Sequence, residues 1–213
     1  SQPPAGIGPG VCGGGRRMVG TAAGRCFLTA WPDVASLPLH CVFRRFSQVP
    51  VDKPAVALLA PNPLEDMDEV RQIFREYAAS LDVDLQFQDF EAEIADLPGD
   101  YAAPRGHILL ARVDGAVAGC CALRPLDNCD YANAAEMRRL FVRKAFRGFG
   151  LGRQLAEAML DVARQAGYDH VLLDTLDDME SARALYVDLG FEEIPPYYHN
   201  PIAGAHYLKA DIF

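Results

Sequence analysis

The stretch Arg147-Gly148-Phe149-Gly150-Leu151-Gly152 decides how this chain is expected to fold. An apolar segment, Leu140-Phe141-Val142, precedes it, and a helical pattern runs from Leu151 to Ala166. Glycines let a ligand approach the main chain closely, and the first turn of a helix has unpaired N–H groups in a positive potential. A strand, a glycine turn and a helix N-terminus in this order predict an anion site that suits a pyrophosphate.

Two common phosphate-binding motifs fit this spacing less well. A P-loop ends in Gly-Lys-Ser/Thr, whereas Arg153 follows Gly152. The dinucleotide fingerprint reads G-x-G-x-x-G, whereas the glycines here read G-x-G-x-G. Asp169 and Asp174 lie about twenty positions further on, where that fingerprint has its acidic residue, so a dinucleotide site stays open as an alternative.

The spacing Arg147-x-x-Gly150-x-Gly152 resembles the acetyl-CoA signature of the GNAT family of N-acetyltransferases. In that family a later short helix carries Ala-x-x-Leu-Tyr and ends in Leu-Gly-Phe. This chain has Ala182-Arg183-Ala184-Leu185-Tyr186 and then Leu189-Gly190-Phe191 in the same order. The resemblance covers roughly residues 55–213 and implies that acetyl-CoA is the co-substrate.

The remaining sequence alternates between strand and helix patterns. Asp114-Gly115 predicts a two-residue hairpin and so antiparallel pairing, whereas the strand–helix–strand unit 140–174 predicts a parallel crossover. The expected fold is therefore α/β, a mixed sheet with helices on both faces, for which the resemblance implies about seven strands that splay where the cofactor enters. Strands are expected at 55–59, 108–113, 116–123, 136–142 and 171–175 and in a final pair, and helices at 64–81, 87–97, 151–166 and 181–186.

A shift in composition predicts the domain organisation. Residues 1–50 hold five Arg and one Asp, a net charge of +4, and the whole chain carries −9, so residues 51–213 carry −13. The first fifty residues also hold eight of the 18 Gly and six of the 15 Pro. We expect residues 1–53 to be a loosely ordered Gly/Pro/Arg-rich extension and residues 54–213 to be the acetyltransferase domain.

Composition also argues against several classes of protein. No apolar run approaches the length of a membrane span, so no membrane partner is expected. The six cysteines form no C-x-x-C pair, which predicts no metal site and a reduced, cytoplasmic protein. The acidic domain has no basic stripe, so nucleic acid is not an expected partner. Homodimerisation is left open.

The resemblance implies the catalytic candidates. Tyr186 occupies the position where the family commonly carries its general acid, and a phenol can protonate a leaving thiolate. Glu136, on the strand that leads to the glycine turn, is the candidate base. Residues 136, 138, 140 and 142 are expected on one face of that strand. The alternative for Glu136 is an ion pair with Arg138 or Arg124 on a solvated face.

The binding candidates follow from the same strand and turn. Arg124 and Arg138 could hold a substrate carboxylate, and His199, in the loop between the last two strands, could contact the substrate. The residues expected to contact the cofactor are Leu140, Phe141, Val142, Arg147, Gly148, Phe149, Gly150, Leu151, Gly152, Arg153 and Ser181.

Together these features predict an acetyl-CoA-dependent N-acetyltransferase. The expected acceptor is a primary amine of a small molecule, such as an amino acid. Direct transfer in a ternary complex is expected because no cysteine has the setting of a nucleophile. The alternatives are a non-catalytic acyl-CoA-binding module and an enzyme that acts on a polyamine or a protein lysine, which the charge of −13 would favour.

Overall fold

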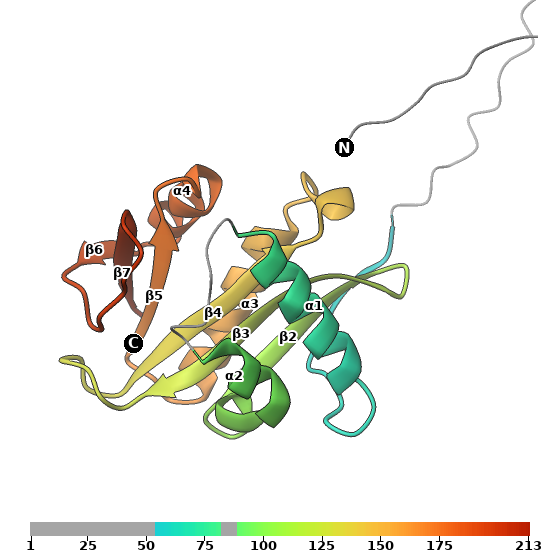
Figure 1. Cartoon of the computed structure of the whole chain (residues 1–213), viewed down its shortest axis with the longest axis horizontal. Helices are drawn as coiled ribbons and strands as arrows, with labels where there is room; N and C mark the ends of the chain where they lie inside the picture. The colour runs from blue at the N-terminus through green and yellow to red at the C-terminus, as the bar shows by residue number, and fades with distance from the viewer. Residues whose placement is uncertain (1–53, 82–88) are drawn as a thin grey trace, which may run out of the picture. The chain divides into compact units, whose positions relative to one another are not determined.

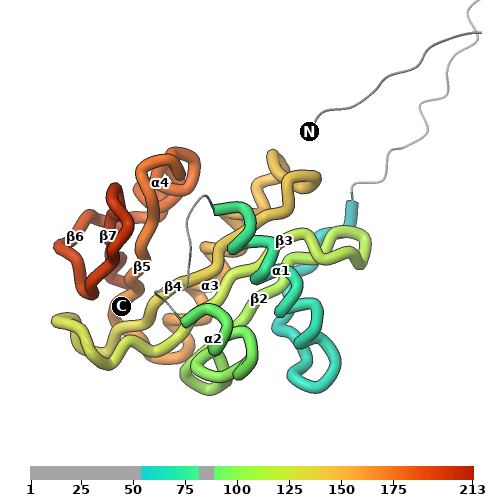
Figure 2. The backbone as a smooth tube through the Cα atoms, in the orientation of Figure 1, coloured from blue at the N-terminus to red at the C-terminus, as the bar shows by residue number. Residues whose placement is uncertain are grey.

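The computed structural model describes residues 54–81 and 89–213, drawn in colour in Figures 1 and 2. The expected extension, residues 1–53, lies outside the described residues. So do the first two residues of the helix expected at 87–97, which is described as α2, Phe90–Asp96. No helix within the described ranges is both long and apolar enough to cross a bilayer.

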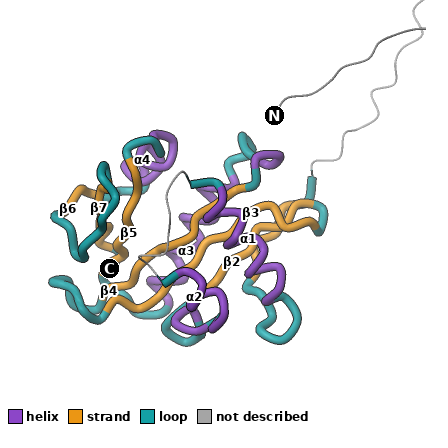
Figure 3. Tube along the Cα trace, in the orientation of Figure 1, coloured by secondary structure: helices purple, strands orange, loops and turns teal. Residues whose placement is uncertain are grey.

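The fold is the expected mixed α/β sheet of seven strands, in the order β1-β2-β3-β4-β5-β7-β6 (Figure 3). The hairpin at Asp114 and Gly115 is confirmed, and both residues have the positive φ that such a turn requires. The strands are β1 Val56–Leu59, β2 His107–Val113, β3 Ala116–Leu126, β4 Ala134–Val142, β5 His170–Leu176, β6 Glu192–Ile194 and β7 Ala205–Asp211. The main helices are α1 Met67–Ala79, α2, α3 Leu151–Gln165 and α4 Glu180–Asp188, with 3-10 turns at Gly99–Tyr101 and Lys144–Phe146.

Helices cover both faces of the sheet, as expected. Figures 1 and 2 show α1 and α2 in front of the sheet and α3 behind it. The adjacent cysteines of β3 mark the two faces, because Cys120 packs into the core under α1 and α2 whereas Cys121 packs into the core under α3 and α4. We refer to these as the α1/α2 face and the α3/α4 face.

The parallel strands β4 and β5 pair only at their beginnings. Three residue pairs join them, from Ala134 with His170 to Glu136 with Leu172. Beyond this point β5 leaves the side of β4 and runs toward α4 (Figure 1). The splay implied by the resemblance is thus present, and it leaves the main chain of β4 after Glu136 without a strand partner on that side.

A β-bulge in β4 corrects one expectation about which side chains share a face. The register with β3 shifts between Cys120, which pairs with Phe141, and Ala122, which pairs with Arg138, so β4 carries one extra residue there. Arg139 in this bulge has a φ of 58°. Because the extra residue breaks the two-residue alternation, Leu140 and Val142 pack on the α3/α4 face and do not share a face with Glu136 and Arg138.

Candidate active site

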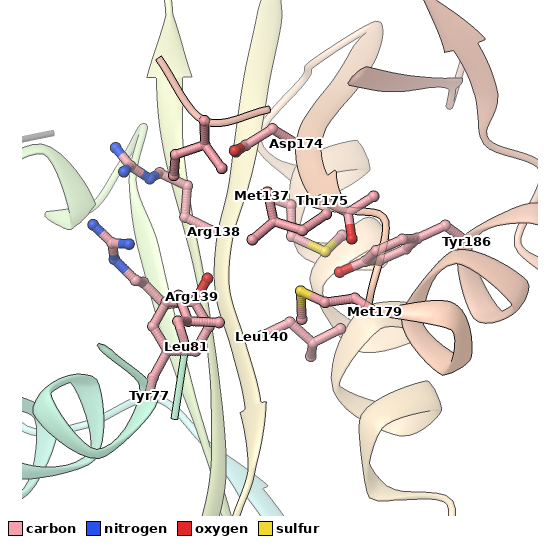
Figure 4. Close-up of a pocket in the computed structure, with 12 residues that line it drawn as sticks. Tyr77, Leu81, Met137, Arg138, Arg139, Leu140, Asp174, Thr175, Met179 and Tyr186 are labelled. Atoms are coloured by element: carbon pink, nitrogen blue, oxygen red, sulfur yellow. The ribbon is translucent and has the colours of Figure 1, made fainter. Parts of the chain in front are cut away.

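A narrow cleft lies where β4 and β5 part (Figure 4). Its cavity volume is about 50 Å³, enough for a thin chain of atoms. Strand β4 forms one wall, and β5 and α4 form the other. The lining residues are Tyr77, Leu81, Met137, Arg138, Arg139, Leu140, Asp174, Thr175, Leu176, Met179, Tyr186 and Ile202.

The glycine turn leaves the N-terminus of α3 open to a ligand. Gly148 and Gly150 have φ values of 88° and 72°, and Gly150 caps the helix without a side-chain hydrogen bond to its first turn. A Cβ at Gly148 would meet no heavy atom within 4 Å, and the Nε of Arg147 donates to the carbonyl of Val142 at 3.0 Å. The turn is therefore tied to β4 while its amides stay accessible, as an anion site requires.

The other proposed cofactor residues have different surroundings. Phe149 is exposed, and Arg153 is exposed and pairs with Asp188 at 2.8 Å. The side chain of Leu151 is buried in the core, so only its main chain could reach a ligand. Ser181 is exposed in the first turn of α4.

Tyr186 reaches the cleft from α4. Its side chain is 6% exposed and packs against Phe191, with ring centroids 5.5 Å apart. Burial raises the pKa of Tyr186, so its phenol stays protonated and able to donate. Thr175 lies in the same wall, and its buried hydroxyl has no hydrogen-bond partner among the described residues.

Glu136 is buried, at 3% exposure, and is surrounded by donors. Its Oε2 accepts a hydrogen bond from the Nε of Arg124 at 2.7 Å and lies 3.8 Å from a guanidinium nitrogen of Arg138. Its Oε1 accepts a hydrogen bond from the hydroxyl of Tyr197 at 2.9 Å. The ion pairs considered from the sequence exist, but they lie in a buried site and not on a solvated face.

A second, wider pocket adjoins the cleft and has a cavity volume of about 260 Å³. All three predicted substrate residues line it: Arg124, Arg138 and the exposed His199. Arg138 lines both spaces, so the two are neighbours. The remaining lining residues are Asp89, Leu126, Asn128, Glu136, Tyr197 and Tyr198. We call this space the acceptor pocket.

Asp174 is a site residue that the sequence indicated only as the acidic residue of a possible dinucleotide site. This carboxylate lines the cleft, and its Oδ2 accepts hydrogen bonds from the Tyr198 hydroxyl at 2.9 Å and from the Asn200 amide at 3.5 Å. Burial, together with the negative charge of Glu136, raises the pKa of Asp174. One signal was available, because an acidic residue follows the buried strand residues Leu172 and Leu173.

Known proteins share this sequence pattern and this fold. Residues 67–191 match the Acetyltransferase (GNAT) family. An uncharacterized N-acetyltransferase of Schizosaccharomyces pombe is 35% identical over 149 residues, which is 70% of this chain and 90% of the relative. A GNAT-family acetyltransferase of Staphylococcus aureus superposes with a TM-score of 0.61 at 20% identity, over 75% of this chain and 100% of that one. A candidate acetyltransferase of Salmonella typhimurium, solved with its cofactor acetyl-CoA, gives a TM-score of 0.54 at 18% identity, over 75% and 95% of the two chains.

The family match spans more than half of the chain, and the S. pombe relative matches over nearly its whole length. This chain therefore belongs to the GNAT family of N-acetyltransferases.

Proposed function

We propose that this enzyme transfers the acetyl group of acetyl-CoA to the primary amine of a small molecule that carries a carboxylate, and that residues 54–213 form the catalytic domain. The observation that carries the proposal is the cleft between β4 and β5. It adjoins a pocket of about 260 Å³ lined by two arginines, and β4, which forms one of its walls, leads toward the uncapped N-terminus of α3.

The residues present fit acetyl-CoA, which would supply a reactive thioester. The amides from Gly148 to Arg153 would hold its pyrophosphate, and the main chain of Leu140 and Val142, which has no strand partner on the β5 side, would hold its pantetheine arm. The neutral phenol of Tyr186 would return a proton to the departing sulfur. The amine would lose its proton to a carboxylate on the acceptor side, where Glu136, the candidate predicted from the sequence, lies.

Direct transfer in a ternary complex is supported by the state of the described cysteines. Cys120 and Cys121 are fully buried, and burial raises the pKa of both thiols. A thiol that stays protonated is a poor nucleophile. Neither lines the cleft or the acceptor pocket, and the third described cysteine, the half-buried Cys129, lines neither space.

The acceptor's carboxylate is supported by Arg124. It is 30% exposed at the acceptor pocket and is held in place by Glu136. Local charges within a few ångströms outweigh a field that salt screens beyond about 10 Å, so this arginine favours an anionic group despite the acidic charge of the domain.

A binding and activity screen tests this function. Calorimetry should show that acetyl-CoA binds, and a panel of amino acids, polyamines and lysine peptides should show acetylation of small carboxylate-bearing amines. Gly152→Val should prevent binding, because a Cβ there meets only a Val142 methyl at 4.0 Å and its branches would project into the ligand space. Gly150→Val is a poorer test, since its φ of 72° makes any side chain strained.

The exposed Gln165→Val, at the other end of α3, is the matched control and should bind normally. Binding without transfer to any amine would favour a non-catalytic acyl-CoA module. Preference for spermidine or lysine peptides would overturn the carboxylate assignment.

A further inference from the structure

We propose that the carboxylate of Asp174 takes the proton from the acceptor amine, and that Glu136 instead positions Arg124. This inference rests on the proposed acetyltransferase function and goes beyond it by naming the proton acceptor and the residues that position it.

Asp174 lies closer to the acyl-transfer path than Glu136 does. It lies two positions after Leu172, the last β5 residue that pairs with β4, and so at the point where the two strands separate. Asp174 lines the same cleft as Tyr186, whereas Glu136 lines the acceptor pocket and is not among the residues that line the cleft. Figure 4 shows Tyr186 entering the cleft from α4, while Asp174 lies on β5 and points toward the side of Arg138.

Strand alternation places the acid and the base on opposite faces of the sheet. Leu173 of β5 packs with Tyr186 in the core of the α3/α4 face. The next residue, Asp174, therefore points to the α1/α2 face, where Glu136 and Arg138 lie. A proton can then leave the amine on one face while another reaches the sulfur on the other.

The hydrogen bonds of the two carboxylates also favour Asp174 over Glu136 as the base. Both oxygens of Glu136 are occupied, Oε1 by Tyr197 and Oε2 by Arg124. Both hydrogen bonds of Asp174 go to Oδ2, from Tyr198 and Asn200. Among the described residues no hydrogen bond reaches its Oδ1. Asp174 thus has an oxygen available for the amine or for a bridging water, whereas Glu136 is engaged in holding a guanidinium.

The surroundings of Asp174 strengthen it as a base. Desolvation and the charge of Glu136 raise its pKa, and the Tyr198 hydrogen bond and two arginines lower it. A carboxylate with a raised pKa is a stronger base than a free one. The titratable or charged groups near it are Glu136, Arg138 and Arg139 from β4, Tyr77 from α1, Tyr186 from α4, and Tyr197, Tyr198 and Tyr207 from the loop and strand beyond β6.

The reaction balances with these groups. The ammonium nitrogen first loses a proton to Asp174 and then forms its bond to the acetyl carbonyl carbon. The carbon–sulfur bond breaks, the nitrogen loses its second proton to solvent, and the sulfur takes one proton from Tyr186. Asp174 then releases its proton to solvent and Tyr186 takes one back from solvent. Two protons thus leave the nitrogen, one is gained by the sulfur, and one is released to solvent in each turnover.

Two matched pairs of variants test the proposal in the full chain with the best acceptor from the amine panel. Asp174→Asn should lower kcat by about 10²-fold or more, the range of general-base catalysis, and remove the acidic limb of the pH profile of kcat/KM. Glu136→Gln should keep that limb but move it to lower pH, because the charge that helps raise the pKa of Asp174 is removed, and should mainly raise KM. Tyr198→Phe removes a donor to ionised Asp174, so the limb should move to higher pH with the plateau kept, whereas Tyr197→Phe should leave the limb in place.

Calorimetry should give the same acetyl-CoA affinity for Asp174→Asn as for the parent, which separates a lost base from a lost fold. The proposal is overturned if Asp174→Asn keeps the acidic limb, if Glu136→Gln removes that limb, or if Tyr197→Phe shifts it while Tyr198→Phe does not. If the parent binds acetyl-CoA but acetylates nothing, the proposed function itself fails and the assignment of Asp174 fails with it.

Discussion

The bidentate pair between Glu93 of α2 and Arg139 of the β4 bulge should be a large single contribution to stability. Two hydrogen bonds of 2.9 and 2.8 Å join them, and the Arg139 side chain is only 2% exposed. Glu93→Gln keeps the shape of the side chain but removes its negative charge. The Arg139 guanidinium keeps its contacts with the Tyr77 and Phe90 rings, whose centroids lie 5.6 and 5.1 Å away. Removing one partner of a buried ion pair costs roughly 3–5 kcal/mol.

This cost is a large part of the about 5–15 kcal/mol that stabilises a typical domain. At about 2–4 °C per kcal/mol for a domain of this size, the midpoint of thermal unfolding should fall by roughly 6–20 °C. Urea unfolding followed by circular dichroism would measure the same loss. Glu91→Gln, on the same helix, is the control: its side chain is 79% exposed and its ion pair with Arg75 spans 3.9 Å, so the change should stay within about 0.5 kcal/mol.

The sign of the pH dependence provides a second check. The pairing with Arg139 lowers the pKa of Glu93 in the folded protein despite the opposing effect of burial. Its contribution is therefore present above the unfolded pKa of 4.5 and is lost as the pH falls through the folded value. The difference between Glu93→Gln and the parent should be full at pH 7 and shrink below pH 4.5. If both variants unfold like the parent at pH 7, the pair does not stabilise the bulge.

Three further outcomes are expected. Tyr186→Phe should lower kcat by about 10²-fold with acetyl-CoA affinity unchanged, because only one hydroxyl is lost; steady-state kinetics with calorimetry would check this. Arg124→Ala should lower kcat/KM about tenfold to a hundredfold for carboxylate-bearing amines and much less for neutral ones, as a charged contact of roughly 1.5–3 kcal/mol requires. Hydrogen bonds with Asp177 and Glu193 raise the pKa of His206. The stabilising effect of this histidine is therefore full below its unfolded pKa of 6.5 and is lost as the pH rises through its folded pKa. His206→Gln should accordingly lower the melting temperature more at pH 5.5 than at pH 9.

Local patterns in the sequence were sufficient for most of the fold. The hairpin at Asp114-Gly115 and the helix after Gly150 depend on neighbouring residues alone, and both appear where they were expected. The bulge at Arg139 could not be anticipated in this way. It is a property of the register between β3 and β4, and its positive φ falls on a residue type that gives no local signal for it.

The candidate site likewise contains residues that local motifs predict and one residue that they do not. The glycine turn and Tyr186 lie in short motifs, so both could be named from the sequence, although their roles stay predictions. Asp174 depends on contacts 24 and 26 residues away, with Tyr198 and Asn200, and on the point at which β4 and β5 separate. No short-range pattern contains that information.

The bulge and the splay have a joint consequence for how two substrates can meet. Before the bulge, Glu136 and Arg138 point to the α1/α2 face; after it, Leu140 and Val142 point to the α3/α4 face, on the side of Tyr186. One strand thereby presents polar groups to the acceptor pocket and apolar side chains to the other face, while the missing β5 partner leaves its main chain open between them. Two reactants can then enter from opposite faces and meet in the gap without displacing each other. The proposed direct transfer in a ternary complex would use this arrangement, because both substrates must be bound at once.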